Sequence, residues 1–246
     1  VRPGDIVDVE IDIRAARDFG GANVVKHLRE HGLGVADPQK TIFTFDCNPT
    51  GSDQKYAANQ QLCREFARLH NIRVFDIDSG IGTHIAIDNG LVGPGGTFVS
   101  TDSHANILGA IGAFGQGMGD VDIAHAFAKG RVWFKVPPSI KITLLGELPE
   151  TCSAKDVALA LLRQMGANGL LGYAAEIYGP AVERFSLQDR ITIASMATEM
   201  GGIIMLFPPS QEVIDFCRNA GAVFEPQYAD ADVVYEKSLD IDITKL

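Results

Sequence analysis

Short apolar runs with strand-like patterns alternate along this chain with amphipathic stretches that have helical spacing. Strands are expected at Asp5–Ile13, Thr41–Asp46, Val74–Ile77, Thr97–Ser100, Val132–Val136, Ile140–Leu145, Ile203–Phe207 and once or twice within Val233–Ile243. Helices are expected up to about His31, over Ser52–His70 and Val121–Lys129, from Ser153, from Ser186 to about Met200, and over Ser210–Ala220. Because strands and helices alternate in both halves, the sequence predicts an α/β fold with helices packed on sheets.

Local signals mark a division of the chain and two helix starts in its second half. Pro137-Pro138 is the strongest break, because proline has no amide hydrogen to donate within a helix or a sheet. Ser153 and Ser186 each precede an aspartate by three positions, which is the spacing of a helix capping box. We therefore expect one α/β domain at residues 1–138 and a second at residues 139–246.

Charge and cysteine content exclude several classes of protein. The formal net charge is −10, and the 21 basic residues are scattered. Nucleic-acid binding needs clustered Lys and Arg, so nucleic acid is not an expected partner. No stretch approaches the roughly 20 apolar residues that span a bilayer, and Val1–Asp5 has no features of a signal or transit peptide. The four cysteines form no C-x-x-C pair, so we expect reduced thiols in a cytoplasmic protein.

The motifs of several common sites are absent from the sequence. It contains no G-x-G-x-x-G, no G-x-x-x-x-G-K-S/T, no H-E-x-x-H and no G-x-S-x-G. Glycines at positions 112, 115, 117 and 119 follow a stretch with helical spacing rather than a strand. We expect them to allow close packing of the backbone beside a site, not to bind a phosphate.

One cluster of polar residues has the placement of a functional site. Thr101-Asp102-Ser103-His104 directly follows the expected strand Thr97–Ser100, and His84 lies one loop upstream. Polar side chains at the carboxyl end of a strand are typical of sites in α/β proteins. Asp102 is expected to fix the tautomer of an imidazole and to favour its protonated form. Taken alone, the tetrapeptide is more typical of a structural turn than of a catalytic site.

The residues around this cluster resemble the large subunits of the aconitase family. Residues 98–135 contain the D-S-H motif, the glycine-rich region and the W-F-K-V strand of the family's central block. Further segments are similar in the same order: Val1–Asp18 to the P-G-D-x-V opening, Phe45–Asn48 to the D-H segment, Gly172–Gly179 to a G-x-x-x-E-x-x-G turn, and Tyr235–Leu246 to the stretch before the first cluster cysteine. The likeness covers nearly the whole chain and points to the isopropylmalate dehydratase, homoaconitase and dimethylmalate dehydratase group.

This resemblance implies a fold, an activity and partners. It implies three-layer α/β/α domains with mixed sheets, and a hydro-lyase that acts on a hydroxy di- or tricarboxylic acid through a 4Fe–4S cluster. The cluster's cysteine ligands, the substrate-binding arginines and a serine base would lie outside this chain, in the rest of the large subunit or in a separate small subunit. By implication, this stretch alone is inactive.

The resemblance also assigns roles to individual residues. It implies that His84 and Asp102 transfer a proton and that Ser103 and Cys47 bind the substrate. It also implies that His104 lies near the iron-bound oxygen and that Glu176 contacts the hydroxyl or water on the iron. Asp46 would orient the residue that follows it. The family has histidine where this chain has Cys47, so either His84 or His104 supplies the acid here, or turnover is altered.

Two other functions are compatible with these residues. The first is a non-catalytic aconitase-like domain, without a cluster, for subunit assembly or ligand binding; Cys47 favours it. The second is a cluster-free metal hydrolase with His84, Asp102 and His104 as ligands, since these residue types suit zinc or manganese. Retention of Asp102, Ser103, His104 and Glu176 favours the hydro-lyase.

Overall fold

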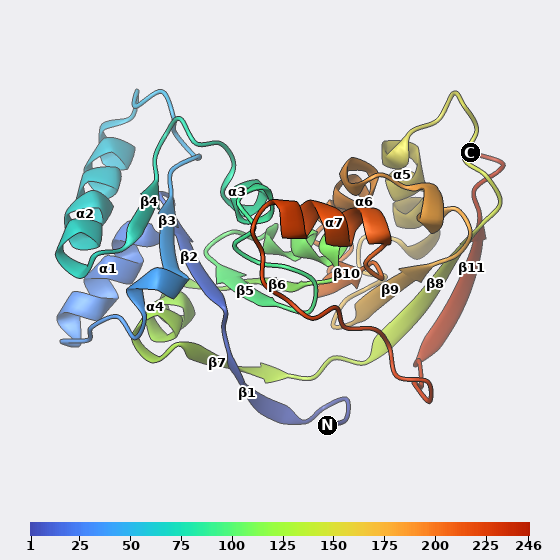
Figure 1. The fold of residues 1–246 in the computed structure, drawn as a ribbon, viewed down its shortest axis with the longest axis horizontal. Coiled ribbons are helices and arrows are strands. Elements are labelled where there is room, and N and C mark those ends of the chain that lie inside the picture. Colours follow the sequence, from blue (N-terminus) through green and yellow to red (C-terminus); the bar gives the residue numbers. More distant parts are fainter.

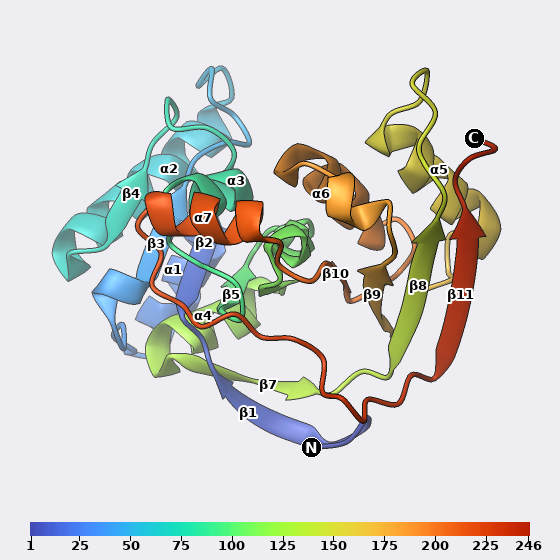
Figure 2. The same ribbon diagram turned by 45° about the vertical axis from the view of Figure 1, so that its right-hand side comes forward.

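The computed structural model describes residues 1–246 and contains two parallel sheets that lie side by side (Figure 1). The first sheet has the order β4 (Arg73–Phe75), β3 (Thr41–Thr44), β2 (Ile13–Arg17), β5 (Thr97–Ser100) and β6 (Phe114–Gly117). The second has the order β10 (Ile204–Leu206), β9 (Ala174–Tyr178), β8 (Ser139–Leu145) and β11 (Lys237–Asp242). An antiparallel ribbon of β1 (Ile6–Glu10) and β7 (Arg131–Lys135) runs along the lower side of the molecule in Figure 2.

The first sheet is covered on both faces and forms the middle of three layers. Successive strand residues point to opposite faces, so Ala15 and Phe98 enter one core while Ala16 and Val99 enter another. Helices α1 (Gly21–Glu30), α2 (Gln54–His70) and α4 (Asp120–Lys129) cover the face of Ala16. Helix α3 (Gly82–Asp88) and the 3-10 helix η2 (Ala105–Ile111) cover the other. This arrangement confirms the expected α/β class.

The second sheet packs its helices on one face. Ile140 and Ile142 of β8 share a core with α5 (Ala154–Met165) and α6 (Leu187–Ala194), while Lys141 between them is half-buried on the opposite face. The remaining short 3-10 helices are η1 (Pro38–Lys40), η3 (Val182–Arg184) and η4 (Ser195–Ala197). None of the helices is both long and apolar enough to cross a membrane.

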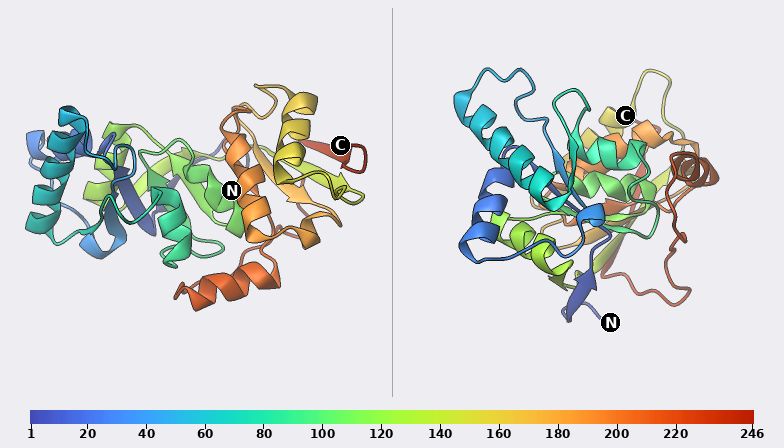
Figure 3. Two further views of the ribbon diagram at one scale, coloured as in Figure 1. Left: turned by 90° about the horizontal axis from the view of Figure 1, so that it is seen from above. Right: turned by 60° about the vertical axis from the view of Figure 1, so that its left-hand side comes forward.

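Helix α7 (Gln211–Asn219) connects the two halves. Seen from above, it stands apart from α5 and α6, which lie at the opposite end from α1 and α2 (Figure 3). The segment after α7 packs on the Gly90 turn, where an added Cβ would lie 2.5 Å from the Ala220 carbonyl oxygen.

The chain changes sheet across Pro137-Pro138, between β7 and β8, while one apolar core joins both sheets. The division at residue 138 stays a prediction.

Both expected capping boxes are confirmed. The Ser153 amide donates to Asp156 Oδ2 at 2.8 Å, and the Ser186 amide donates to Asp189 Oδ2 at 3.1 Å. A side-chain oxygen that accepts from the first helical turn satisfies a donor that would otherwise have no partner, and this fixes where α5 and α6 begin.

Two expectations about the strands were wrong, and one strand was not predicted. The sheets are not mixed: each of the two larger sheets is wholly parallel, because crossover segments return every strand in the same direction. Ile13–Arg17, expected as the end of one strand and the start of a helix, is the central strand β2, separated from β1 by Ile11 and Asp12. Strand β6, which contains the glycines at 115 and 117 and pairs with β5, was not predicted; as expected, these glycines follow a helical segment, η2.

Candidate active site

Polar residues that are distant in sequence meet where three neighbouring strands end. Asp18 follows β2, Asp46-Cys47 follows β3 by one residue, and Asp102 lies two residues after β5. The carboxyl ends of parallel strands lie at one edge of a sheet, which is the usual position of sites in α/β folds. The sheet order β3-β2-β5 therefore brings together three segments of the expected site.

Asp102 is buried and fully engaged in contacts with neighbouring groups. Its side chain is 4% exposed, and its Oδ1 lies 3.0 Å from Arg17 Nη1. The same oxygen accepts from the His104 amide at 3.0 Å, and Oδ2 accepts from Thr83 Oγ1 at 3.2 Å. The expected partner, His84, forms no hydrogen bond with this carboxylate. Asp102 therefore holds the backbone of His104 and the side chain of Arg17, rather than an imidazole ring.

Arg17 is a site residue that sequence reasoning missed. Its Nε lies 2.7 Å from Asp46 Oδ1, so one guanidinium bridges two carboxylates that are each 4% exposed. Burial lowers the pKa of Arg17, but Asp102 and Asp46 together outweigh burial and the pKa is raised overall. The guanidinium is therefore a permanent cation. No motif marked this residue, and the segment that holds it was expected to be helical.

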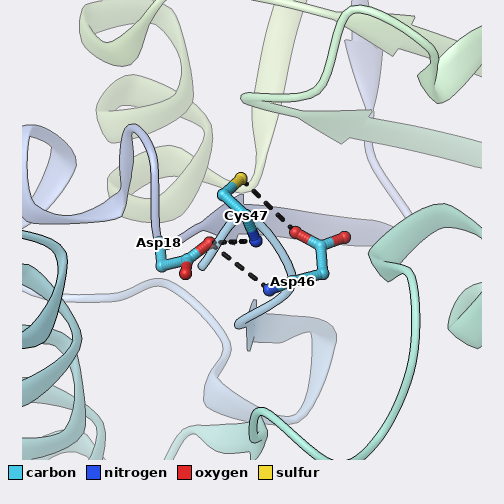
Figure 4. Close-up of side chains that lie close together, drawn as sticks. All are labelled: Asp18, Asp46 and Cys47. Carbon is cyan, nitrogen blue, oxygen red and sulfur yellow. Dashed lines mark hydrogen bonds between the residues drawn. The ribbon is translucent and has the colours of Figure 1, made fainter. Parts of the chain in front are cut away.

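Asp46 and Cys47 are held in a tight turn by Asp18 (Figure 4). Asp18 Oδ1 accepts the Cys47 amide at 3.1 Å, and its Oδ2 accepts Gln60 Nε2 at 2.9 Å. Asp46 Oδ2 accepts the Gly82 amide at the start of α3, at 2.7 Å. This carboxylate thus connects β2, β3 and α3, while its expected role of orienting Cys47 stays a prediction.

Cys47 is a neutral thiol in this environment. Its Sγ lies 3.5 Å from Asp46 Oδ1. Burial is the main cause that raises its pKa to about 12, and the carboxylates of Asp18 and Asp46 raise it further, against the effect of Arg17. A protonated thiol at neutral pH is a poor proton acceptor and carries no charge. Cys47 therefore does not replace an imidazole in proton transfer.

The structure argues against a metal site of His84, Asp102 and His104. The one group of three side chains whose ligating atoms lie within 4.8 Å of one another is Asp18, Asp46 and Cys47. In that group, Asp18 binds backbone amides and Gln60, and Asp46 is neutralised by Arg17. The oxygens of Asp102 contact Arg17, Thr83 and the backbone amide of His104, and neither oxygen is hydrogen-bonded to an imidazole ring of the two histidines.

His104 lies between a hydroxyl and a carboxylate. Its Nδ1 is 3.2 Å from Ser103 Oγ, and its Nε2 is 3.0 Å from Glu199 Oε1. The His104 and Glu199 side chains are 43% and 42% exposed, so the pair is open to a ligand. Nearby, Thr198 Oγ1 donates to the Ser103 carbonyl at 3.0 Å. The second half of the chain thus contacts the Asp102–His104 loop directly, and sequence reasoning missed Glu199.

Glu176, the glutamate expected at this site, lies elsewhere. It is on β9, on the sheet face opposite to Ala175 and Ile177, which pack in the core with α5 and α6. Its Oε2 accepts from Tyr178 at 2.6 Å and from Tyr235 at 2.8 Å. It lines a separate cavity of about 400 Å³. The alternation of side chains along β9 is the physical reason that Glu176 does not reach His104.

A cavity of about 430 Å³ collects the remaining site residues. It is lined by Arg17, Ile81, Thr83, His84, Asp102, His104, Ile107, Ile191, Thr192 and Ser195. His84 is one of these lining residues, and its Nδ1 atom is buried without a hydrogen-bond partner in the protein. The structure therefore brings His84, Asp102, Ser103 and His104 together. Asp46, followed by Cys47, is connected to this group through Arg17.

The glycines of β6 allow the close backbone packing that the sequence suggested. A Cβ on Gly117 would lie 2.5 Å from the Asp102 carbonyl oxygen and 2.9 Å from Ser103 Cα. A Cβ on Gly115 would collide with the Ala105 carbonyl oxygen. Only residues without a side chain permit β6 to lie against the Asp102–His104 loop.

Comparisons with known proteins match the chain along nearly its full length. Residues 3–245 match the sequence model of the aconitase family (aconitate hydratase). The chain is 36% identical over 246 residues to 3-isopropylmalate dehydratase large subunit 1 of Methanopyrus kandleri, with 99% of this chain and 59% of that protein aligned. It is 35% identical over 247 residues to the homoaconitase large subunit of Thermus thermophilus, with 100% of this chain and 58% of that protein aligned. The chain spans about 59% of the length of these curated relatives.

Proposed function

This chain belongs to the aconitase family, and on that premise we propose that it forms one wall of the active site of a hydro-lyase. The reaction would remove water from, or add it to, a hydroxy di- or tricarboxylic acid such as isopropylmalate, homocitrate or dimethylmalate. The single observation that carries this proposal is that His84 and His104 line one cavity with the Arg17–Asp102 ion pair, while Glu199 contacts the His104 ring.

His104 is the proposed proton donor to the hydroxyl that leaves. Its ring contacts Ser103 at Nδ1 and Glu199 at Nε2, which fixes its orientation. The His104 and Glu199 side chains are 43% and 42% exposed, so a substrate hydroxyl has access to this pair. In this proposal Glu199 takes the role that the sequence assigned to Glu176.

His84 and Ser103 are the other proposed ligands of the substrate. His84 lines the same cavity, and the Ser103 hydroxyl is hydrogen-bonded only to the adjacent ring. Ser103 can donate to a carboxylate or a hydroxyl without breaking a strong internal contact. Asp102 holds the loop that carries Ser103 and His104.

The proposed 4Fe–4S cluster would be bound by another part of the protein. When bound, such a cluster supplies a Lewis acid for the departing hydroxyl. The cysteines here do not fit as its ligands: Cys63 and Cys217 are buried in two different apolar cores, and the only group of three potential ligating residues contains one cysteine, Cys47. We place the cluster ligands in the length that the relatives have beyond this chain.

The negative charge around the site supports the proposal that other parts of the protein contact it. Asp18, Asp46, Asp102 and Glu199 surround the site, and Arg17 is already paired with two of them. A polycarboxylate substrate therefore needs cations from elsewhere, which we propose are in the remaining part of the large subunit and in a small subunit. The relatives are named as large subunits, which is consistent with such a partner.

A non-catalytic ligand-binding or assembly role is the second candidate, and the neutral Cys47 thiol is the observation that favours it. The two functions differ in the expected effect of changing His104. In the full-length protein with its small subunit and reconstituted cluster, His104→Gln is expected to lower kcat by about 10²–10⁴, the usual range for a general acid. His31→Gln, at an exposed position at the end of α1, is the control. An active wild-type complex whose rate is unchanged by His104→Gln would refute the proposed role.

A further inference from the structure

Arg17 connects three strand ends that are far apart in sequence. It is the last residue of β2, the central strand of the group β3-β2-β5. Its Nε contacts Asp46, 29 residues away, at 2.7 Å, and its Nη1 contacts Asp102 at 3.0 Å. Its own amide donates to Thr101 Oγ1 at 2.9 Å, so the backbone of Arg17 is attached to the same loop as its side chain.

Each carboxylate that Arg17 binds also holds a backbone amide of the site. Asp46 Oδ2 accepts the Gly82 amide at the start of the helix that carries His84. Asp102 Oδ1 accepts the amide of His104. The positions of both histidine-bearing segments therefore depend on two carboxylates, and the positions of those carboxylates depend on one guanidinium.

Arg17 also determines the charge at this point of the cavity. The titratable or charged groups around it are Asp18, Asp46, Cys47, His84, Asp102, His104 and Glu199. Among the residues that line the cavity, Arg17 is the only permanent cation. Without it, two carboxylates of 4% exposure would remain without a counter-charge, and burial strongly disfavours such charges.

We propose that Arg17 is a positioning residue for the reaction at this site, acting through Asp46 and Asp102 on His84 and His104. This inference rests on the proposed hydro-lyase function. Lysine is a poor substitute at this position, because its single ammonium lacks the fork that reaches two carboxylates in fixed directions. Arginine at residue 17 thus sets the distance between the loops that follow β3 and β5.

The kinetic test uses the full-length protein with its small subunit and reconstituted cluster. Arg17→Gln is expected to lower kcat by about 30-fold or more while KM changes by less than about threefold, because a misplaced catalytic group affects turnover more than binding. Arg17→Lys is expected to recover part of the lost kcat, because it restores one cation beside the two carboxylates.

Arg64→Gln is the matched control. Arg64 binds Asp76 through two contacts, of 2.8 and 2.6 Å, and does not line the site cavity. Its replacement removes an arginine–aspartate ion pair whose carboxylate is more exposed than Asp46 and Asp102, and it is expected to leave kcat within about twofold. An unchanged kcat in Arg17→Gln, or a KM that rises as much as kcat falls, would overturn the proposal.

A measurement without substrate separates this inference from the proposed function. In Arg17→Gln, the amides of Gly82 and His104 are expected to exchange hydrogen at least about tenfold faster than in the wild type, while Arg64→Gln leaves them unchanged. An inactive wild-type complex that shows this acceleration would refute the hydro-lyase but retain Arg17 as the residue that holds both loops. Unchanged exchange at both amides would overturn the inference, whether or not the complex is active.

Discussion

Gly117→Ala tests whether close backbone packing positions the Asp102–His104 loop. The substitution adds one methyl group to β6, at a residue that does not line the site cavity. That methyl carbon would lie 2.5 Å from the Asp102 carbonyl oxygen and 2.9 Å from Ser103 Cα. Both neighbours are backbone, so they cannot move aside as the end of a flexible side chain would. The loop must withdraw by roughly an ångström to reach ordinary van der Waals distance.

The size of the effect follows from this displacement. Overpacking of a well-packed interior costs about 1–3 kcal/mol of unfolding free energy. A misplacement of about 1 Å at a catalytic group can lower turnover by about 10². We therefore expect Gly117→Ala to lower the free energy of unfolding by about 1–3 kcal/mol in urea denaturation of the full-length protein. Its kcat should fall by tenfold or more, with a smaller change in KM.

Gly34→Ala is the matched control for this experiment. An added Cβ at Gly34 meets no atom within 4 Å, and the backbone there has no positive φ. The same chemical change is thus made in open space, and both stability and turnover are expected to stay near wild type. If Gly117→Ala behaves like Gly34→Ala in both assays, the proposed packing of β6 against the catalytic loop is refuted.

Two further predictions concern Glu199 and Cys47. Glu199→Gln is expected to lower kcat by about tenfold or more, whereas Glu176→Gln is expected to keep kcat within about twofold of wild type. The reverse order in steady-state kinetics would favour Glu176, the residue that the sequence assigned to this role. Because burial raises the pKa of Cys47 to about 12, alkylation of the native protein at pH 8 should be at least about a hundredfold slower than in the unfolded chain, where the thiol has an ordinary pKa of about 8.5. The native rate should then rise with pH toward 12, and equal rates at pH 8 in peptide mapping would contradict the neutral thiol.

Much of the fold was predictable because its signals are local. The strand Thr97–Ser100 and the helix starts at Ser153 and Ser186 follow from apolar patterning and from side chains within one turn. Strand β2 was missed because Arg14, Ala15 and Ala16 have little intrinsic preference for strands. Only the tertiary structure explains a buried arginine there: Arg14 Nη2 donates to the carbonyl of Asp37, 23 residues away, at 3.1 Å.

The candidate site likewise contains residues that the sequence predicted and residues that it did not. Asp46, Asp102 and His104 were predictable because each follows a strand of one parallel sheet, and such strand ends converge. Arg17 and Glu199 were missed because their partners are long-range: Asp102 lies in another strand connection, and His104 is 95 residues from Glu199. Glu176 lay in a recognisable turn pattern, but strand alternation directs it to the other face of its sheet.

The most direct test of the central claim is transfer of a hydroxyl from solvent. The full-length protein, with its small subunit and reconstituted cluster, is incubated with an unsaturated di- or tricarboxylic acid in heavy-oxygen-labelled water, and the hydroxy acid is analysed by mass spectrometry. The wild type is expected to form a hydroxy acid that carries solvent oxygen, and Asp102→Asn to form much less. No labelled product from isopropylmalate-, homocitrate- or dimethylmalate-type acids, with an intact cluster, would contradict the assignment of this chain to a hydro-lyase active site.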